Sequence, residues 1–368
     1  MDILRSIHVW EIDGYIKLEE KFIDYILKKA SENYGSLNKA REQLNLNKYF
    51  SNKNNFYNYF KKADILFKFT DAMNISRSEI EQNIISWKDS KRDLPKGGYQ
   101  IKFPIQINPL FVRIISHLIG DGNINRTSTW MQNNVKPLEK LQIKLFKTGF
   151  KERKTRKNTI TIPKILLKVF CSLFNIPINK LNKIILLENC LKLPREYKIQ
   201  VLSALIEDEG TITDYVINIR MRNKELMCLI CELIDSLGYD RGSLNESQQL
   251  SGFSQIRGSI YSISINISGA HKYIRDLTNL ERKYGEEICL WKKKEKLENL
   301  LQHKSKIRGW KKNRFLTQQI LKNKEFFSFS EIKSQFLLKD NEVMSLIRFM
   351  KNQNLINNVS RGEYKIKE

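Results

Sequence analysis

The sequence predicts an α+β fold in which a duplicated core lies between two smaller flanking domains. Two apolar segments, 114–122 and 202–210, share one helical pattern and each ends in an acid followed by glycine. The same order of elements follows both segments, and the chain outside this repeat has helix-rich patterns. The expected boundaries are 1–90 (helical domain), 91–108 (linker), 109–190 (first half), 191–303 (second half), 304–314 (basic linker) and 315–368 (C-terminal domain).

The two acid-glycine segments predict a pair of closely packed helices. Ser116 and Gly120 are spaced by one helical turn in the first segment, and Ala204 and Asp208 in the second. Small side chains at this spacing allow two helix backbones to approach closely, and the final glycine can end a helix. We therefore expect the last acids of the two segments to lie side by side at the ends of these helices.

This position is electrostatically unfavourable for a pair of acids, which are Asp121 and Glu209. A helix C-terminus carries about half a negative charge, so carboxylates there repel the helix dipole and each other. A divalent cation would remove this repulsion, and Mg²⁺ is commonly bound by one or two carboxylates together with waters and phosphate.

The repeat continues beyond the two helices. Asn134 and Asn223 each precede an apolar helix, and alternating strand patterns follow at 158–162 and 261–267. Each copy closes with a further helix, at 164–174 and 270–280, while the second copy has an additional stretch, 240–258, that predicts a longer hairpin. Such a duplication indicates two halves related by a pseudo-two-fold axis.

These motifs resemble the LAGLIDADG homing-endonuclease family. The second segment is similar to the nine-residue signature at nearly every position, and the first is looser, with Ile119 in place of the earlier acid. The resemblance covers about 106–303 and implies a two-motif, monomeric member with curved antiparallel sheets and the signature helices at the interface. It also implies that Asp121 and Glu209 bind Mg²⁺ or another divalent cation and that the partner is double-stranded DNA.

One residue of the second segment departs from the family pattern. Asp208 stands where the signature prefers a small residue, opposite Gly120 in a symmetric packing. The acid is either a further ligand of metal or water, with Gly120 beside it in the candidate metal site, or an acid tolerated because glycine faces it. Sequence alone leaves both alternatives open.

Family members also keep a lysine near the active site after each half. Lys180 or Lys183 matches this place after the first half, and Lys293 within the segment 291–294 matches it after the second. We take Lys183 and Lys293 as catalytic candidates, because a cation there would stabilise charge on phosphate. The alternative is that they are ordinary surface lysines.

Basic residues on the predicted strands and loops of the core are candidates for DNA contacts. In the family the strand faces read DNA, and the candidates here are Lys151, Arg153, Lys154, Arg156, Lys157, Arg220, Arg222, Arg241 and Arg257.

The N-terminal domain has the element order of a helix-turn-helix. Helices are predicted at 18–33 and 37–44, followed by a helix rich in Asn, Lys and Tyr, and then by helices at 64–73 and 77–88. Archaeal members of the family often join such a domain to the core through a similar linker, so this part is archaeal-like. The alternative is a helical bundle with a solvated polar face. The expected DNA contacts are Lys53, Asn54, Tyr57 and Lys61.

The C-terminal domain resembles a winged helix. Helices are predicted at 315–323, 329–337 and 340–353, followed by a hairpin over 355–366. The expected recognition helix carries Arg348, Lys351 and Asn352 and is only modestly basic. Protein binding is therefore the alternative to DNA binding.

Composition favours a nucleic-acid partner. The 368 residues include 64 Lys and Arg against 40 Asp and Glu, a net charge of +24, and this excess attracts polyanions. Five cysteines argue against a disulfide framework, and Cys228 and Cys231 fit a buried helix face better than a zinc site. No signal peptide or membrane span is evident, so we expect a cytoplasmic protein.

Two functions from different classes fit these observations. The first is a Mg²⁺-dependent, sequence-specific DNA endonuclease in which Asp121 and Glu209 hold metal at the scissile phosphates. The second is a transcription regulator on the same scaffold without nuclease activity, as in a bacterial sporulation-regulator family. RNA binding is a weaker third reading. Two halves in one chain make a monomer sufficient for either function.

Overall fold

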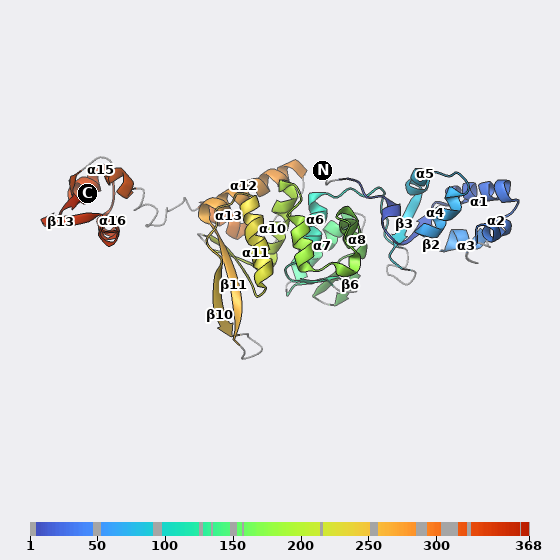
Figure 1. The fold of residues 1–368 in the computed structure, drawn as a ribbon, viewed down its shortest axis with the longest axis horizontal. Coiled ribbons are helices and arrows are strands. Elements are labelled where there is room, and N and C mark those ends of the chain that lie inside the picture. The colour runs from blue at the N-terminus through green and yellow to red at the C-terminus, as the bar shows by residue number, and fades with distance from the viewer. Residues whose placement is uncertain are drawn as a thin grey trace. The chain divides into compact units, whose positions relative to one another are not determined.

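The computed structural model describes residues 5–46, 53–90, 98–124, 128–133, 135–147, 153–156, 158–213, 216–250, 257–284, 293–302, 316–321, 325–360 and 362–367. The chain divides into two compact units, Met1–Leu300 and Leu301–Glu368, which are described separately. Figure 1 shows their elements. The described parts are a mixture of helices and antiparallel sheets, as the sequence predicts.

In the part that the structure describes, the first half of the core contains three helices and a four-stranded sheet. The sheet has the antiparallel order β4-β5-β7-β6. The elements in chain order are α6 (Pro109–Ser116), β4 (Gly122–Asn123), β5 (Thr129–Met131), α7 (Val135–Lys147), β6 (Arg153–Arg156), β7 (Thr159–Thr161) and α8 (Lys164–Leu173).

The second half repeats this plan with longer strands. Its antiparallel sheet has the order β10-β11-β9-β8. When the strands of each half are counted along the chain, both sheets have the same spatial order of first, second, fourth and third strand. The predicted longer hairpin is formed by β10 and β11 (Figure 1). The elements are α10 (Arg195–Glu209), β8 (Gly210–Ile212), β9 (Val216–Met221), α11 (Lys224–Ser236), β10 (Asn245–Leu250), β11 (Arg257–Asn266) and α12 (Ile267–Tyr284).

Short segments follow each half. Between the halves lie η3 (Ile178–Lys180) and α9 (Lys183–Cys190), which begins where the Asn182 side chain accepts a hydrogen bond from the backbone N–H of Ile185. Such a cap satisfies an N–H group that has no partner within the helix. After the second half, α13 covers Lys294–Gln302.

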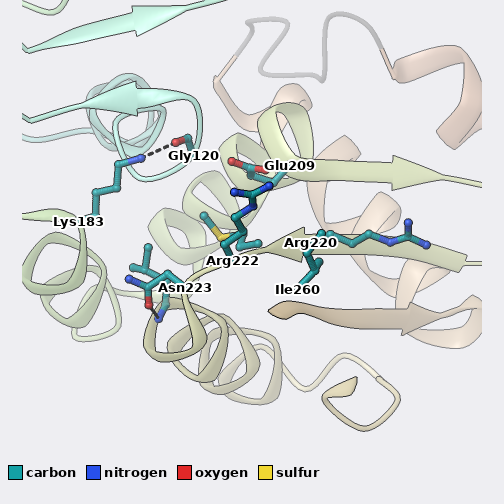
Figure 2. Close-up of a pocket in the computed structure, with 9 residues that line it drawn as sticks. Gly120, Lys183, Glu209, Arg220, Arg222, Asn223 and Ile260 are labelled. Carbon is teal, nitrogen blue, oxygen red and sulfur yellow. Dashed lines mark hydrogen bonds between the residues drawn. The ribbon is translucent and has the colours of Figure 1, made fainter. Parts of the chain in front are cut away.

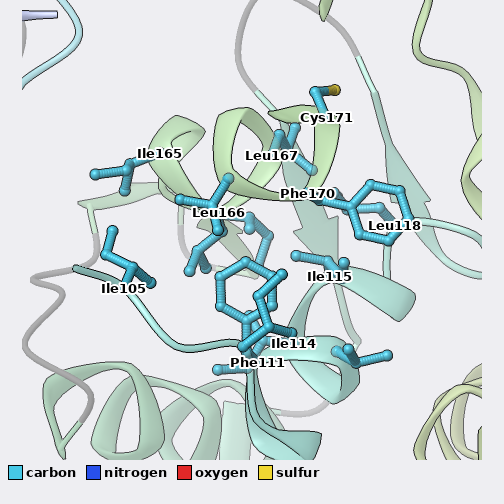
Figure 3. Packing of buried hydrophobic residues seen from close by; sticks show 14 of the residues in the cluster. Ile105, Phe111, Ile114, Ile115, Leu118, Ile165, Leu166, Leu167, Phe170 and Cys171 are labelled. Carbon is cyan, nitrogen blue, oxygen red and sulfur yellow. The ribbon is translucent and has the colours of Figure 1, made fainter. Parts of the chain in front are cut away.

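The hydrophobic core of the first half lies between α6 and α8. Phe111, Ile114 and Ile115 of α6 are buried and face Leu166 and Phe170 of α8 (Figure 3). Burial of several side chains of this size contributes roughly 1.5–3 kcal/mol each. This packing fixes α6, and with it the acid that follows α6, relative to the sheet.

The N-terminal part of the first unit combines helices with a small antiparallel sheet of order β2-β1-β3. The predicted helix over 77–88 is wrong after Gln82, because Ile84 to Lys88 form a strand that pairs with β1 and buries Trp87. The elements are η1 (Val9–Glu11), β1 (Tyr15–Leu18), α1 (Glu20–Tyr34), α2 (Leu37–Gln43), α3 (Lys53–Asn58), β2 (Lys61–Lys62), α4 (Ala63–Asp71), α5 (Arg77–Gln82) and β3 (Ile84–Lys88).

The described part of the segment treated as a linker is packed rather than solvated. Tyr99 forms a β-bridge with Trp87, and Ile105 forms one with Ile7. Alternate side chains from Tyr99 to Ile107 are buried. This period of two is that of an extended strand with one buried face.

The C-terminal unit has the predicted order of helices followed by a hairpin, with one strand that the pattern did not predict. Its sheet has the order β12-β14-β13, and its own core includes Phe327, Leu346 and Met350. The elements are a helix at 316–321, β12 (Phe326–Ser328), α15 (Phe329–Gln335), α16 (Asp340–Asn352), β13 (Ile356–Ser360) and β14 (Glu363–Ile366). Within the described residues, no helix combines the length and apolar character that crossing a bilayer requires.

Candidate functional site

Asp121 and Glu209, the two acids predicted to lie together, are close enough for their charges to interact. Asp121 follows the turn that ends α6, and Glu209 is the last residue of α10, which packs against α6. Burial, together with the negative charges of Asp121 and Asp208, raises the pKa of the Glu209 carboxyl to about 7, against the effect of nearby lysines. Asp121 is exposed, whereas Glu209 is partly buried.

Close approach of the two helices depends on Gly120. A Cβ atom at this position would lie 2.6 Å from the Cβ of Asp208, a distance that requires a shift of one of the backbones. Gly120, in the turn that follows α6, therefore accommodates the acid of α10, which was one of the two alternatives for Asp208. The spacing of small residues in the sequence predicted this contact.

The Asp208 carboxylate faces the protein interior. Its side chain and that of His117 are both 0% exposed, and His117 Nδ1 lies 3.1 Å from each carboxylate oxygen. Trp130 Nε1 donates a hydrogen bond of 3.2 Å to the same carboxylate. This geometry corrects the expectation that Asp208 coordinates metal, because its oxygens are directed to buried donors and away from solvent.

Gln132 is a site residue that the sequence did not indicate. Its Nε2 donates to Asp121 Oδ2 at 2.6 Å and lies 3.4 Å from Asp208 Oδ1. The residue follows β5 and is nearly buried. No motif marks it, since the matching position of the second half holds a methionine, Met221.

Lys183 lies at the site, and Lys180 is exposed in the preceding turn. Lys183 Nζ donates to the carbonyl oxygen of Gly120 at 2.6 Å, so this oxygen, which was counted in the candidate metal site, already has a cationic partner. Burial lowers the pKa of Lys183, and the carboxylates of Glu209, Asp121 and Asp208 oppose that change.

Lys293 is placed at the end of α10 rather than toward open solvent. Its Nζ donates to the carbonyl oxygens of Ile206 and Glu207, each at 2.7 Å, and also to that of Gly210. These are carbonyls at a helix C-terminus, where a cation is favourable. Lys293 therefore stabilises the helix end that carries Glu209, and its positive charge also favours the ionised form of that acid.

A pocket of about 420 Å³ opens beside Glu209. In Figure 2 the guanidinium of Arg222 points toward Glu209, whereas that of Arg220 points away from it along the sheet. Both arginines are exposed. The lining residues are Gly120, Lys183, Glu209, Arg220, Met221, Arg222, Asn223, Leu226 and Ile260. The pocket therefore offers cationic side chains within reach of the acid pair.

Among the other predicted DNA contacts in the core, Arg241 is the one whose side chain the structure describes. Arg241 is paired with an acid of the same half, because its Nε and Nη2 donate to the two carboxylate oxygens of Asp235 at 2.7 and 2.6 Å. The remaining candidates, which lie outside the described residues or have side chains outside them, are Lys151, Arg153, Lys154, Arg156, Lys157 and Arg257.

Two N-terminal candidates are corrected by their packing. Lys61 is buried in β2, where its Nζ lies 5.2 Å from the ring centroid of Phe56. Tyr57 directs its hydroxyl to the carboxylate of Asp24 on α1. Asn54 is exposed, and the side chain of Lys53 lies outside the described part of the chain. The predicted recognition surface is thus reduced, because the Lys61 side chain is buried and the Tyr57 hydroxyl is bonded to an exposed carboxylate of α1.

The donor set is compatible with a divalent cation bound by few protein ligands. Across the described ranges, no three His, Cys, Asp or Glu side chains gather as a metal cluster, and Cys231 is buried while Cys228 is exposed. Asp121 and Glu209 supply hard oxygen ligands from two sides. Mg²⁺ typically takes one or two such carboxylates and completes its shell with waters and substrate phosphate.

The raised pKa of Glu209 predicts a pH-dependent affinity for divalent cations. A proton and a cation compete for this carboxylate, which is mostly protonated below its pKa of about 7. Between pH 8 and pH 6 we expect Mn²⁺ binding at this carboxylate to weaken by about tenfold, measured by calorimetry. The Glu209→Gln variant should lose that dependence. An affinity that is constant over this range in the wild-type protein would contradict the prediction.

Comparison with known proteins gives only weak similarities. No protein-family model and no curated protein sequence matches the chain. A structure of mesophilic variants of the homing endonuclease I-DmoI is 13% identical with a TM-score of 0.28, covering 49% of this chain and 97% of that one. I-DmoI in complex with DNA and Ca has 14% identity, a TM-score of 0.28 and coverages of 47% and 88%.

A second kind of solved structure is similar over a longer part of the chain. Full-length DUF199/WhiA from Thermatoga maritima is 12% identical with a TM-score of 0.31, and the match covers 68% of this chain and 93% of that one. Scores this low carry no argument about function. The function of this protein is therefore inferred from the geometry and charge of its site.

Proposed function

We propose that this protein is a metal-dependent endonuclease that binds and cuts double-stranded DNA. The observation that carries the proposal is the pairing of Asp121 and Glu209 at the ends of α6 and α10, between two antiparallel sheets built to one plan. Two neighbouring carboxylates repel each other, which is unfavourable unless a cation is bound between them. The net charge of +24 supports a polyanionic partner.

Asp121 and Glu209 are the residues that would hold the cation, which we take to be Mg²⁺ or another divalent ion. A bound ion of this type supplies a nucleophilic water and stabilises the leaving oxygen in phosphodiester hydrolysis. Lys293 keeps the end of α10 in place through its backbone carbonyl contacts. Lys183 holds the Gly120 carbonyl and places positive charge beside both acids.

Arg220 and Arg222 are the best-placed phosphate contacts among the described residues. Both line the pocket that contains Glu209, and both are exposed. Arginine side chains bind phosphate oxygens through two N–H groups at once, which fixes the register of a duplex. The two sheets would then contact adjacent segments of DNA, and one chain supplies both acids, so a monomer is sufficient.

The alternative is a DNA-binding regulator without nuclease activity. The flanking parts favour it, since α2 and α3 have a helix-turn-helix order and the C-terminal unit has helices followed by a hairpin, as in a winged helix. Additional binding modules are useful to a regulator. The paired acids oppose this alternative, because a pure binder gains nothing from a carboxyl whose pKa is raised to about 7.

One selection experiment separates the two functions. The full-length protein would be incubated with a library of randomised linear duplexes in Mg²⁺, and both the bound fraction and the newly formed ends would be sequenced. A nuclease yields recurrent breaks within one enriched motif, and these are absent when Ca²⁺ or EDTA replaces Mg²⁺. An enriched motif without breaks supports the regulator, and the absence of any enriched duplex contradicts both.

A further inference from the structure

We infer that Asp208 and His117 form a buried positioning pair that holds Gln132, and through it Asp121, whereas none of the described residues supports Glu209 in this way. The inference rests on the proposed role of Asp121 as a metal ligand. It assigns Asp208 to the support of the site rather than to the metal. The two halves of the centre are then chemically unlike.

The contacts around Asp208 form a continuous buried network. His117 and Trp130 are fully buried and both contact the Asp208 carboxylate, at 3.1 and 3.2 Å. The Gln132 amide lies between Asp208 and Asp121 and donates to Asp121 at 2.6 Å. A carboxylate held by buried donors has one preferred orientation, because leaving any of these groups without a partner is costly.

The repeat provides an internal control for this network. In the first sheet Gly122 pairs with Trp130, and in the second Gly210 pairs with Ile219. Trp130 therefore corresponds to Ile219, and Gln132, two residues further on, corresponds to Met221. Tryptophan and glutamine in one half are thus replaced by side chains without N–H donors in the other.

The helical segments 114–122 and 202–210 also differ in this way, with each polar residue of the network matched by an apolar residue or glycine in the other segment. Counted back from the final glycine of each segment, His117 corresponds to Leu205, and Asp208 corresponds to Gly120. All polar members of the network thus lie around Asp121, and every matching position around Glu209 is apolar or glycine. A set of linked replacements of this kind indicates one function, which is to orient a single carboxylate.

Around Glu209 the corresponding positions hold apolar side chains or glycine. Met221 lines the same pocket as Glu209, and a thioether cannot donate a hydrogen bond. Within the described part of the chain, burial and nearby charges, and not hydrogen bonds, account for the raised pKa of the Glu209 carboxyl. Asp121 is therefore preorganised for a cation, whereas Glu209 becomes ordered only when one binds.

Three variants of the full-length protein test the inference by Mn²⁺ calorimetry at pH 7.5. Removal of an indirect support of a metal ligand typically weakens metal affinity by 10–100-fold, so Gln132→Met and Asp208→Ala are each expected to weaken Mn²⁺ binding by about tenfold or more. Asp208→Asn keeps an oxygen for Trp130 and Gln132 and should remain within about twofold of the wild type. Ile219→Val, at the buried position of the other half that corresponds to Trp130, is the control and should leave affinity unchanged.

The Asn variant decides between support and ligation. If Asp208→Asn weakens binding as much as Asp208→Ala, Asp208 is a metal ligand and the inference is overturned. It is also overturned if Gln132→Met and Asp208→Ala bind Mn²⁺ as the wild type does. Thermal unfolding of each variant would establish that the protein remains folded.

A readout without metal separates this inference from the proposed function. The side-chain amide resonances of Gln132 report its two carboxylate contacts and should shift in Asp208→Ala but hardly in Asp208→Asn or Glu209→Gln. If the wild-type protein binds no Mn²⁺, the metal-dependent function fails, while the amide shifts still test the network. Unchanged Gln132 resonances in folded Asp208→Ala would overturn the positioning role.

Discussion

Mg²⁺-dependent strand cleavage is expected to fall by at least about 10³-fold when Asp121 is replaced by Asn or Glu209 by Gln. Each substitution keeps the shape of the side chain and removes the charge that would hold the cation. Duplex binding should change by no more than a few-fold, because in the proposed complex arginines such as Arg220 and Arg222, which line the pocket, would make the phosphate contacts. Loss of one acid would also remove repulsion between the two helix ends.

The measurement is single-turnover cleavage of a duplex selected from the randomised library, with binding measured in parallel in Ca²⁺. Glu225→Gln is a matched control, since Glu225 is an exposed acid in the first turn of α11. This variant should cut and bind as the wild type does. Full cleavage by both Asp121→Asn and Glu209→Gln would eliminate the two acids as the metal site.

The second large effect is expected on stability, from Gly120→Ala. The added Cβ would lie 2.6 Å from the Cβ of Asp208 and 2.7 Å from its Oδ2, so the packed helices must separate or the buried network must shift. Overpacking of this type costs about 1–3 kcal/mol of unfolding free energy. Gly258→Ala is the control, because a Cβ there meets nothing within 4 Å.

A double-mutant cycle identifies the source of that cost. In an Asp208→Gly background every Asp208 side-chain atom that the added Cβ would meet is absent, so Gly120→Ala should be less damaging there by about 1 kcal/mol or more. Denaturant unfolding of the four proteins gives the coupling energy. Equal costs in both backgrounds would mean that Gly120 is required for a reason other than its contact with Asp208.

The main features of the fold were predictable because they depend on local patterns. The small residues of segments 114–122 and 202–210 predicted the close helices, and the extra stretch 240–258 predicted the longer hairpin of the second half. The strand Ile84–Lys88 was not predicted, since its apolar residues also fit a helical face. Only pairing with β1, which is distant in the sequence, shows that this segment is a strand and not a helix.

The site was predictable only in part, for a related reason. Asp121, Glu209 and the nearby lysines follow from the repeat and from the family pattern. The contact of Trp130 and Gln132 with Asp208 joins residues from opposite halves of the chain, and no local pattern records it. The sequence also does not show that the Lys61 side chain is buried against Phe56 or that Arg241 is paired with Asp235, because both contacts depend on the tertiary structure.

The strand-like segment from Tyr99 to Ile107 has a practical consequence for shortened versions of this protein. Its buried face includes Ile101, Phe103 and Ile105, and its edges are bridged to Ile7 and Trp87. A truncated chain beginning at residue 91 would lose those bridging partners and uncover a row of apolar side chains. Aggregation of such a fragment would therefore reflect the exposure of these apolar side chains to solvent. Shortened versions that contain the duplicated core should retain the first ninety residues.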